Sequence, residues 1–503
     1  MTEIVDREGP EPATAGRRWV GPCAEVAVSF ATAGLFMLWS RNTDVDPLDR
    51  LGQIAGISAM AFRYTVISGL LVAAVVIAAR VRAGIAFDMT SRLVCAAVAG
   101  LVSGMVAGGI VIALRGTPWG LNGNEGDAGD LIKWALDVRA GNHPPYAYPP
   151  LGLHVLDRYA RVRDIEVAFA LKHLQILGTA ALGPAAYLSW RLLLRPGWAL
   201  GVGMIAALPL IDVAPYKPYT SLVLIVFVPA AIRMLEMIRH ADQVSIPQSA
   251  RRGVLMGAGF GLLCLLYSGW FKWSAPGLLF AVLVVFPWRS RVGTRKALVF
   301  GAVAFATFAL LAGGHVRDAL TENFSDSYKY FDVGVEPAYI AMYRNDLPGT
   351  LFSWPPLGEL GGVGVFSIIL YAGFGAAVVL GRSRTLVIGV GAIMTGCWLL
   401  RFYYAQDLYA TGRVQLYPRT TAEILYCLLI FCCYAVYLAM ERASRRGAPE
   451  SLLRSPSGLI GAVCGLLLLL GSAASSISDH YMPSSTKPPG PGWLTWTAHQ
   501  MPH

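Results

Sequence analysis

Long apolar stretches, separated by short polar ones, run along almost the whole chain. A bilayer core about 30 Å thick requires about 20 apolar residues per crossing helix, and fewer where neighbours bury a broken or re-entrant helix. Such stretches are centred near thirteen positions, namely Ala31, Val72, Val102, Leu177, Ala206, Val226, Gly261, Ala281, Phe305, Leu370, Ile393, Leu429 and Leu466. The pattern predicts an all-α polytopic membrane protein with about 13 transmembrane helices and no large soluble domain.

Composition agrees with a membrane protein. Of 503 residues, 55% are hydrophobic and only 14% are charged, whereas soluble proteins contain roughly 25% charged residues. The net charge is +10, but the basic residues are spread over short loops and do not form one surface with interleaved aromatics, so we expect no nucleic-acid partner. The eight cysteines all lie in apolar segments without metal-ligand spacing, which argues against a disulfide framework or a zinc site.

The distribution of Lys and Arg predicts the orientation. Short cytoplasmic loops are enriched in these residues, and here they recur in alternate loops, at positions 17–18, 80–82, 191–195, 239–252, 289–296, 382–384 and 442–446. We therefore expect a multi-pass protein of the plasma membrane. Its predicted parts are a cytoplasmic tail (1–19), a transmembrane domain (20–478) with external loops at 115–166 and 315–357, and an external tail (479–503). This last tail is rich in Pro and Ser, which favours an extended conformation.

An acidic, glycine-rich sequence interrupts the apolar pattern at residues 122–130. Glycines at 123, 126 and 129 allow tight turns, and we expect them to bring together Glu125, Asp127 and Asp130 before a helix over 131–139. A carboxylate here could act as a general base or bind a divalent cation. Helix capping by Asp127 or Asp130 is the simpler alternative for either residue. Three carboxylates exceed what capping needs, so the cluster favours a functional site.

The same loop ends in a proline-rich segment, Asn142 to Pro150, which restricts the backbone to extended conformations. Tyr146 and Tyr148 offer flat faces for a sugar ring, and His143 could donate to a hydroxyl or phosphate. Interfacial aromatics at a turn are the alternative interpretation.

Single cations occur at the predicted external ends of several helices. Lys217, Lys272 and Arg419 are each flanked by aromatics or proline, and Arg401 lies close to the last of them in sequence. Cations on the side that normally excludes them call for a local counter-charge, which a lipid-linked phosphate would supply. Snorkelling to lipid headgroups is the alternative. The loop at 315–357 interleaves tyrosines with acids, as a carbohydrate surface does, or as an interfacial lid without a ligand would.

Taken in order, these segments resemble the GT-C superfamily of membrane glycosyltransferases, and more closely the galactan 5-O-arabinofuranosyltransferase family of mycolic-acid bacteria. The similar segments cover most of the membrane region: the acidic loop leading to Tyr-Pro-Pro (125–150), Pro-Tyr-Lys-Pro-Tyr (215–219), an aromatic loop (267–273) and Tyr-Pro-Arg-Thr (417–420). Members of the family carry a folded external domain after the last helix, whereas only residues 479–503 follow here.

The resemblance implies transfer of D-arabinofuranose from decaprenylphosphoryl arabinose to a galactan hydroxyl outside the membrane. It implies Asp127 as the base, with Glu125 as main competitor and Asp130 in support, and Lys217, Lys272, Arg419 and Arg401 around the donor phosphate. His143, Tyr146, Tyr148 and Tyr417 would contact sugar or acceptor. Whether a divalent cation on Glu125, Asp127 and Asp130 takes part is left open.

Two other functional classes remain as alternatives. A polytopic transporter or lipid-linked sugar flippase would need ionisable residues near mid-span, paired across helices. Most charges here lie at predicted helix ends, with Lys172 and Glu423 as the few exceptions, so transport ranks second. A non-catalytic membrane scaffold would require the acidic loop to be dispensable.

Overall fold

The computed structural model describes residues 17–81, 84–143, 145, 148–213, 216–321, 327–329, 365–415, 417–445, 456–486 and 490–502. Only the backbone is described for 17–19, 81, 84–87, 213, 327–329, 365, 413–415, 417–418 and 456–460.

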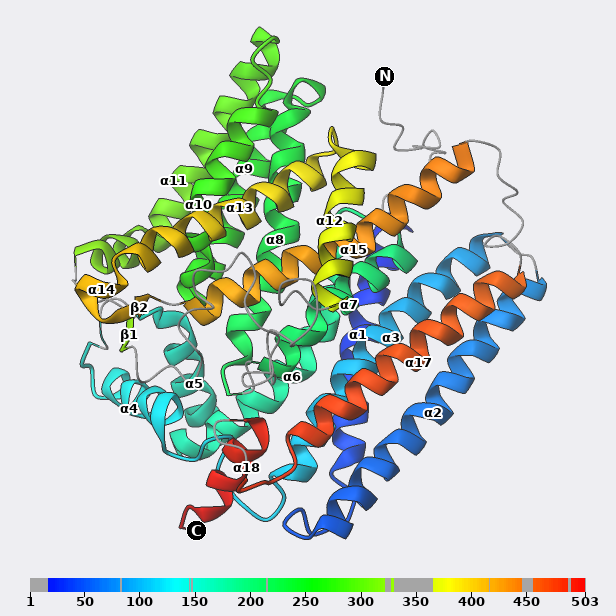
Figure 1. Ribbon diagram of the computed structural model, residues 1–503, viewed down its shortest axis with the longest axis vertical. Coiled ribbons are helices and arrows are strands. Elements are labelled where there is room, and N and C mark those ends of the chain that lie inside the picture. The colour runs from blue at the N-terminus through cyan, green and yellow to red at the C-terminus, as the bar shows by residue number, and fades with distance from the viewer. Residues whose placement is uncertain are drawn as a thin grey trace.

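These residues form a helical bundle, as the apolar pattern predicts (Figure 1). The helices are α1 (Arg17–Ser40), α2 (Arg50–Val81), α3 (Gly84–Ala113), α4 (Gly126–Arg139), α5 (Pro150–Arg163), α6 (Val167–Trp190), α7 (Pro196–Val213), α8 (Pro218–Arg239), α9 (Ile246–Leu266), α10 (Gly269–Val285), α11 (Arg291–Thr321), α12 (Val365–Gly381), α13 (Thr385–Gln406), α14 (Leu408–Thr411), α15 (Tyr417–Arg445), α17 (Pro456–His480) and α18 (Pro491–Gln500). A 3-10 turn, η1 (Ala241–Gln243), follows α8. Two short strands, β1 (Ser327–Lys329) and β2 (Arg413–Gln415), pair antiparallel with Tyr328 opposite Val414.

Every one of the thirteen predicted centres falls inside a helix. Within the described part of the chain, nine helices are long and apolar enough to cross a membrane: α1, α2, α3, α8, α9, α11, α13, α15 and α17. Helix α6 passes the same test together with α5, from which it is bent by 110°, and α7, α10 and α12 are shorter apolar helices. The all-α membrane architecture is therefore confirmed, and the described residues contain no separate soluble domain.

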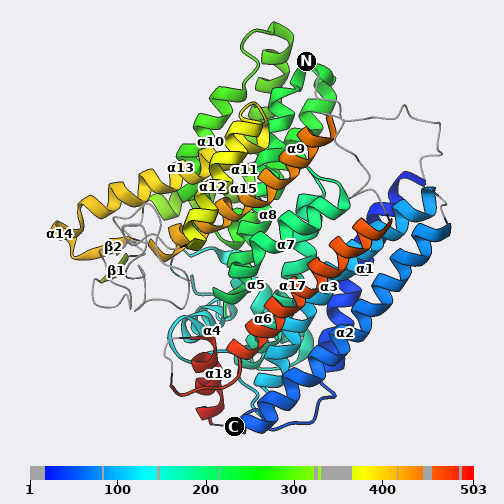
Figure 2. The ribbon, with the colours of Figure 1, turned by 45° about the vertical axis from the view of Figure 1, so that its right-hand side comes forward.

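Helix α3 forms the centre of one half of the bundle, and α1, α2, α6 and α17 surround it. Its glycines allow this packing, since a Cβ on Gly104 would come within 3.0 Å of the Ala33 backbone of α1. Helices in lipid associate through such close approach of small residues. Lipid tails are as apolar as the helices, so the hydrophobic effect does not drive the helices together. The other half contains α8 to α15, with α10 packed on α13, α9 on α11 and α12 on α15 (Figure 2).

The two ends of the bundle differ in the segments that they carry. One end, here called the loop end, carries α4, α5 and α18, which lie together in both views (Figures 1 and 2). The opposite end, here called the basic end, carries the loops that are rich in Lys and Arg. Arg239 there donates to the Ser383 carbonyl at 2.7 Å, and Lys296 to that of Asp242 at 2.9 Å. Loops predicted to share a side thus contact one another.

The predicted external loop at 315–357 is partly a helix, because α11 continues to Thr321. Except for β1, the remainder of that loop lies outside the described residues. All eight cysteines are free thiols.

The prediction of an extended C-terminal tail is wrong. Residues 491–500 form α18, which begins with Pro491 at its first turn and buries Leu494, Thr495 and Ala498. Proline is favoured at the first helical position because its missing N–H needs no partner there. Local composition gave the wrong answer because packing against the bundle stabilises this helix.

A buried ionic cluster ties α1, α3 and α6 together. The Glu25 carboxylate is 2% exposed and accepts hydrogen bonds from Arg191 Nε and the Tyr187 hydroxyl, both at 2.8 Å. Arg92 of α3 approaches the same carboxylate at 3.9 Å. Removing one member of such a cluster leaves a buried charge uncompensated.

We expect Glu25→Ala to lower the free energy of unfolding by roughly 3–5 kcal/mol. The matched control is Asp479→Ala, which breaks the exposed pair with Arg50 (3.5 Å) and should cost less than about 1 kcal/mol. Unfolding in mixed detergent micelles, followed by circular dichroism, measures both. Equal losses would contradict the structural role assigned to Glu25.

Candidate functional site

The acidic loop leaves α3 at the loop end and turns tightly before α4. Asn122 has φ 72°, Gly123 φ 56° and Gly126 φ 49°, and the Asn122 side-chain amide donates to the Glu125 carbonyl at 2.6 Å. Left-handed φ values favour Gly and Asn. The sequence prediction that glycines at 123 and 126 permit tight turns is confirmed, and Gly129 lies against the Asn124 carbonyl with no space for a Cβ.

The structure separates the three acidic side chains of this loop. The N-cap position of α4 is occupied by Glu125, whose side chain makes no capping hydrogen bond. Neither Asp127 nor Asp130 occupies that position, so the predicted capping by one of them is not observed. Asp127 lies in the first turn, where the helix dipole stabilises a negative charge. Its Oδ2 is 2.8 Å from Lys217 Nζ. Glu125 and Asp130 are exposed, and within the described part of the chain neither forms an ion pair.

Lys217 is held in this position by helix α6 and by a proline. It is the N-cap of α8, with Pro218 as the first helical residue. A Cβ on Gly178 of α6 would come within 2.6 Å of Pro218 Cγ, so only glycine permits this approach. The Lys217 side chain is 13% exposed and that of Asp127 45%. The cation is therefore enclosed, whereas the carboxylate faces solvent.

Two polar side chains of α6 fix the backbone of both loops. Gln175, 1% exposed, accepts from the Leu121 N–H at 2.8 Å and donates to the Leu121 and Tyr216 carbonyls, each at 3.3 Å. Lys172 donates to the carbonyls of Leu114 and Thr117, at 3.0 and 2.5 Å. Lys172 is thus engaged with the end of α3 and the start of the acidic loop. The sequence did not single out Gln175, because a polar residue in an apolar helix does not show which groups it will bond.

Tyr148 connects α4, α8 and the ion pair. Its ring lies 4.5 Å from that of Trp134, and its face is 5.8 Å from Lys217 Nζ. Its hydroxyl is 2.5 Å from the hydroxyl of Tyr219. The sequence singled out Tyr148 and missed the role of Tyr219, although both belong to predicted motif segments.

The aromatic loop between α9 and α10 joins the same cluster. Trp270 Nε1 donates to the Thr220 carbonyl at 2.7 Å, and the Tyr267 and Trp270 rings are 5.5 Å apart. Arg419, at the start of α15, lies over the Tyr267 ring at 5.2 Å. Contacts between neighbouring side chains therefore link all four segments on which the family resemblance depends.

The two other predicted phosphate ligands differ in exposure. Lys272 is exposed, lies over the rings of Tyr404 (5.3 Å) and Trp273 (5.8 Å), and forms no ion pair with any described residue. Arg401 is buried, 2% exposed, and its guanidinium is 3.3 Å from Thr421 Oγ1. Lys272 is thus open to a ligand, and Arg401 is enclosed between α13 and α15.

The predicted sugar-binding residues are described unevenly. His143 is exposed. Tyr146 lies outside the described residues, and so does the side chain of Tyr417, whose backbone begins α15. Of this group, only Tyr148 is seen to join the ion-pair cluster.

Helix α4 is held against α5 by a buried carboxylate. Asp157 is 5% exposed and accepts from Arg139 Nε at 2.8 Å and Arg161 Nε at 3.1 Å. Burial by itself would raise the pKa of Asp157, but hydrogen bonds and charges from the two arginines hold this pKa below its ordinary value. The helix that bears Asp127 is thereby fixed at its C-terminal end.

The C-terminal tail closes over the start of the acidic loop. Asn122 N–H donates to the Leu494 carbonyl at 2.8 Å, and Thr117 Oγ1 to that of Ala498 at 3.0 Å. Trp119 Nε1 donates to the Pro502 carbonyl, and His499 Nε2 lies 2.8 Å from the Ala113 carbonyl. Nothing in the sequence of the tail indicated these contacts, because each joins residues far apart in the chain.

Among the described residues, no group of three or more His, Cys, Asp and Glu side chains is arranged to hold a metal ion. Glu125, Asp127 and Asp130 therefore do not converge on a shared metal position.

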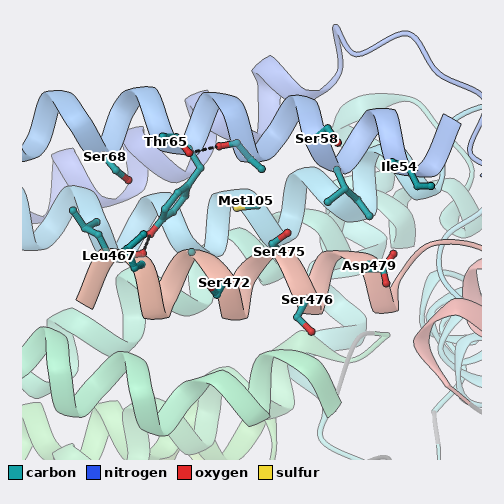
Figure 3. A pocket seen from close by; sticks show the side chains of 15 residues that line it. Ile54, Ser58, Thr65, Ser68, Met105, Leu467, Ser472, Ser475, Ser476 and Asp479 are labelled. Atoms are coloured by element: carbon teal, nitrogen blue, oxygen red, sulfur yellow. Dashed lines mark hydrogen bonds between the residues drawn. The ribbon is translucent and has the colours of Figure 1, made fainter. Parts of the chain in front are cut away.

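A groove of about 670 Å³ lies elsewhere, between α2 and α17 with Met105 of α3 at its floor (Figure 3). Its walls carry hydroxyls, including Ser58, Thr65 and Ser475, and the Tyr64 hydroxyl donates to the Leu467 carbonyl at 2.9 Å. None of the residues predicted for catalysis or donor binding lines it. The groove is thus separate from the Asp127 cluster.

Comparison with known proteins does not supply a family. No protein-family model matches the sequence, and no curated protein matches it. The chemistry of the loop end must therefore be inferred from its own residues.

Removal of residues 490–503 should loosen the acidic loop without unfolding the bundle. We expect the Asn122 amide to lose its protection and exchange its hydrogen at least about tenfold faster, the factor that corresponds to about 1.4 kcal/mol. Amides at 135–139, held through Asp157, are the internal control. Hydrogen-exchange mass spectrometry resolves both segments, and unchanged exchange at 121–123 would refute the contact.

Proposed function

We propose that this protein is a membrane glycosyltransferase that uses a polyprenyl-phosphate sugar as donor. The most specific form of the proposal is transfer of D-arabinofuranose from decaprenylphosphoryl arabinose to a galactan hydroxyl in cell-wall arabinogalactan synthesis. The observation that carries it is the ion pair between Asp127 and Lys217 at the meeting point of four segments. The sugar and the acceptor themselves come from the family resemblance.

The reaction needs a base and a cation close together. The acceptor hydroxyl oxygen attacks the anomeric carbon of the donor, and its proton passes to a carboxylate, here Asp127. The bond between that carbon and the phosphate oxygen breaks, and polyprenyl phosphate leaves with the bonding electrons. Lys217 stabilises the departing phosphate, with Arg419 and Lys272 as further cations on the same side. The phosphate already carries negative charge, so its departure needs no acid.

Aromatic residues and Arg419 are suited to bind the sugar and the phosphate of the donor. Tyr148 packs on Trp134 and lies against the Lys217 ammonium, and these rings offer faces on which a sugar can stack. Arg419 over Tyr267 gives a charged group with a fixed orientation, which favours phosphate recognition. In this proposal the loop end faces the outside of the plasma membrane and the basic end faces the cytoplasm.

The alternative, a transporter or lipid-linked sugar flippase, has one favourable observation. Glu423 of α15 is fully buried and its Oε1 accepts from the Ser274 hydroxyl, while its Oε2 has no hydrogen-bond partner among the residues that the structure describes. Ionisable groups inside a membrane often mark a transport path. Substrate counterflow in vesicles without lipid donor would favour this alternative.

Asp127→Asn should reduce transfer by roughly 10²- to 10⁴-fold, the usual contribution of a general base. Glu125→Gln, measured separately, tests the competing carboxylate. Asp164→Asn is the charge-matched control, because Asp164 has φ 50°, a conformation that Asn tolerates. The assay uses lipid-phosphate arabinose and a short galactan acceptor. Full turnover by both Asp127→Asn and Glu125→Gln, with folding intact, would rule out this loop.

Sidedness is tested with single added cysteines. Asn124→Cys at the loop end should react with a membrane-impermeant maleimide in intact cells, whereas Arg289→Cys at the basic end should react only after lysis. The unmodified protein gives the background from its own cysteines. Labelling of both positions from the same side would overturn the proposed orientation.

A further inference from the structure

The Asp127–Lys217 pair holds together the two groups that the proposed reaction must separate. Asp127 Oδ2 and Lys217 Nζ are 2.8 Å apart. While they are paired, the carboxylate shares its proton-accepting oxygen with an ammonium, and the ammonium directs a hydrogen at the carboxylate and away from a phosphate. We propose that this ion pair is a latch, which the phosphate of a lipid-linked donor opens. The inference rests on the proposed function and adds an order of events to it.

The pair is built so that Asp127 is the partner that leaves. Lys217 lies over the Tyr148 ring, and the next residue, Pro218, packs on Gly178 of α6. The Lys217 side chain is 13% exposed. Asp127 is 45% exposed and stays in the first turn of α4 when released, where the helix dipole still stabilises its charge. A partly solvated carboxylate loses little on returning to water.

A phosphate gains contacts that a carboxylate on α4 lacks. Trp270 and Tyr267 connect the start of α8 to Arg419. The same chain of contacts therefore holds a second cation in the cluster that contains Lys217. Three acceptor oxygens let one phosphate bind two cations at once. The donor thus displaces Asp127 from Lys217 and, in the same step, frees the base.

The consequence is an ordered reaction. Without the donor, Asp127 stays paired and no acceptor hydroxyl is activated. With the donor bound, the carboxylate is free beside the anomeric carbon. The latch therefore requires that donor binding come before acceptor activation.

The test measures the dissociation constant of a short-chain polyprenyl phosphate in detergent-purified variants. Asp127→Asn should bind roughly fivefold more tightly, the factor that a partly exposed ion pair represents. Lys217→Met should bind at least about tenfold more weakly. Asp164→Asn, which removes a charge from the C-cap of α5, is the matched control and should stay within about twofold of the unaltered protein.

A double variant separates the latch from a general effect of charge. In the Lys217→Met background, Asp127→Asn should no longer change the affinity, because the two residues act as one coupled pair. Tightening that persists there, or no tightening in the single variant, overturns the latch. Size-exclusion profiles and thermal midpoints establish that each variant is folded.

Transfer assays on the same variants keep the two proposals apart. If Asp127→Asn abolishes transfer without tightening phosphate binding, the latch fails and the glycosyltransferase stands. If Asp127→Asn tightens binding and still transfers sugar, the latch stands and Asp127 is not the base. If Lys217→Met affects neither binding nor transfer, both proposals fall.

Discussion

Backbone polar groups at the edge of a lipid-embedded bundle must find partners within the protein, and helix α6 meets this requirement for the loop end. The acidic loop and the Pro-Tyr-Lys-Pro-Tyr loop leave regular helices where little water is available to satisfy their carbonyls and amides. Gln175 bonds to both loops, and Lys172 bonds to the carbonyls at the end of α3. Polar side chains of α6 thus fix the loops at this end of the bundle.

The chemical character of the site follows from this support. With Leu121 and Tyr216 tied to one glutamine, Asp127 and Lys217 meet although 90 positions separate them in the chain. Tyr148 then spans α4 and α8, and Trp270 adds the next loop. Each contact is modest, but together they place a solvent-facing carboxylate against an enclosed ammonium. In the latch proposed above, this unequal exposure lets a phosphate replace the carboxylate.

The sequence predicts local features of this protein well and long-range ones poorly. The length of each apolar stretch is set by the bilayer, so all thirteen predicted centres lie in helices. Turns at Gly123 and Gly126 follow from the conformational freedom of glycine. The choice among Glu125, Asp127 and Asp130 could not be made from spacing, because it depends on a lysine from another loop. Gln175 could not be singled out either, since a polar residue in an apolar helix does not reveal its partners.

In the C-terminal tail, the sequence failed to predict even the local structure. Its proline and serine content predicts an extended chain, yet residues 491–500 are helical because they bury one face on the bundle. Propensity is a weak guide wherever tertiary packing supplies the stability. Both proline-rich segments end in a proline that begins a helix: Pro150 begins α5 and Pro491 begins α18.

The hydrogen bond from Thr117 to Ala498 spans 381 positions, and it has a consequence for biogenesis. During translation the first half of the bundle enters the bilayer long before residues 490–502 leave the ribosome. The acidic loop therefore lacks its contacts with the tail until the C-terminal residues have been synthesised. A ribosome that stalled late would release a protein already inserted in the membrane but still without the contacts that close over its acidic loop.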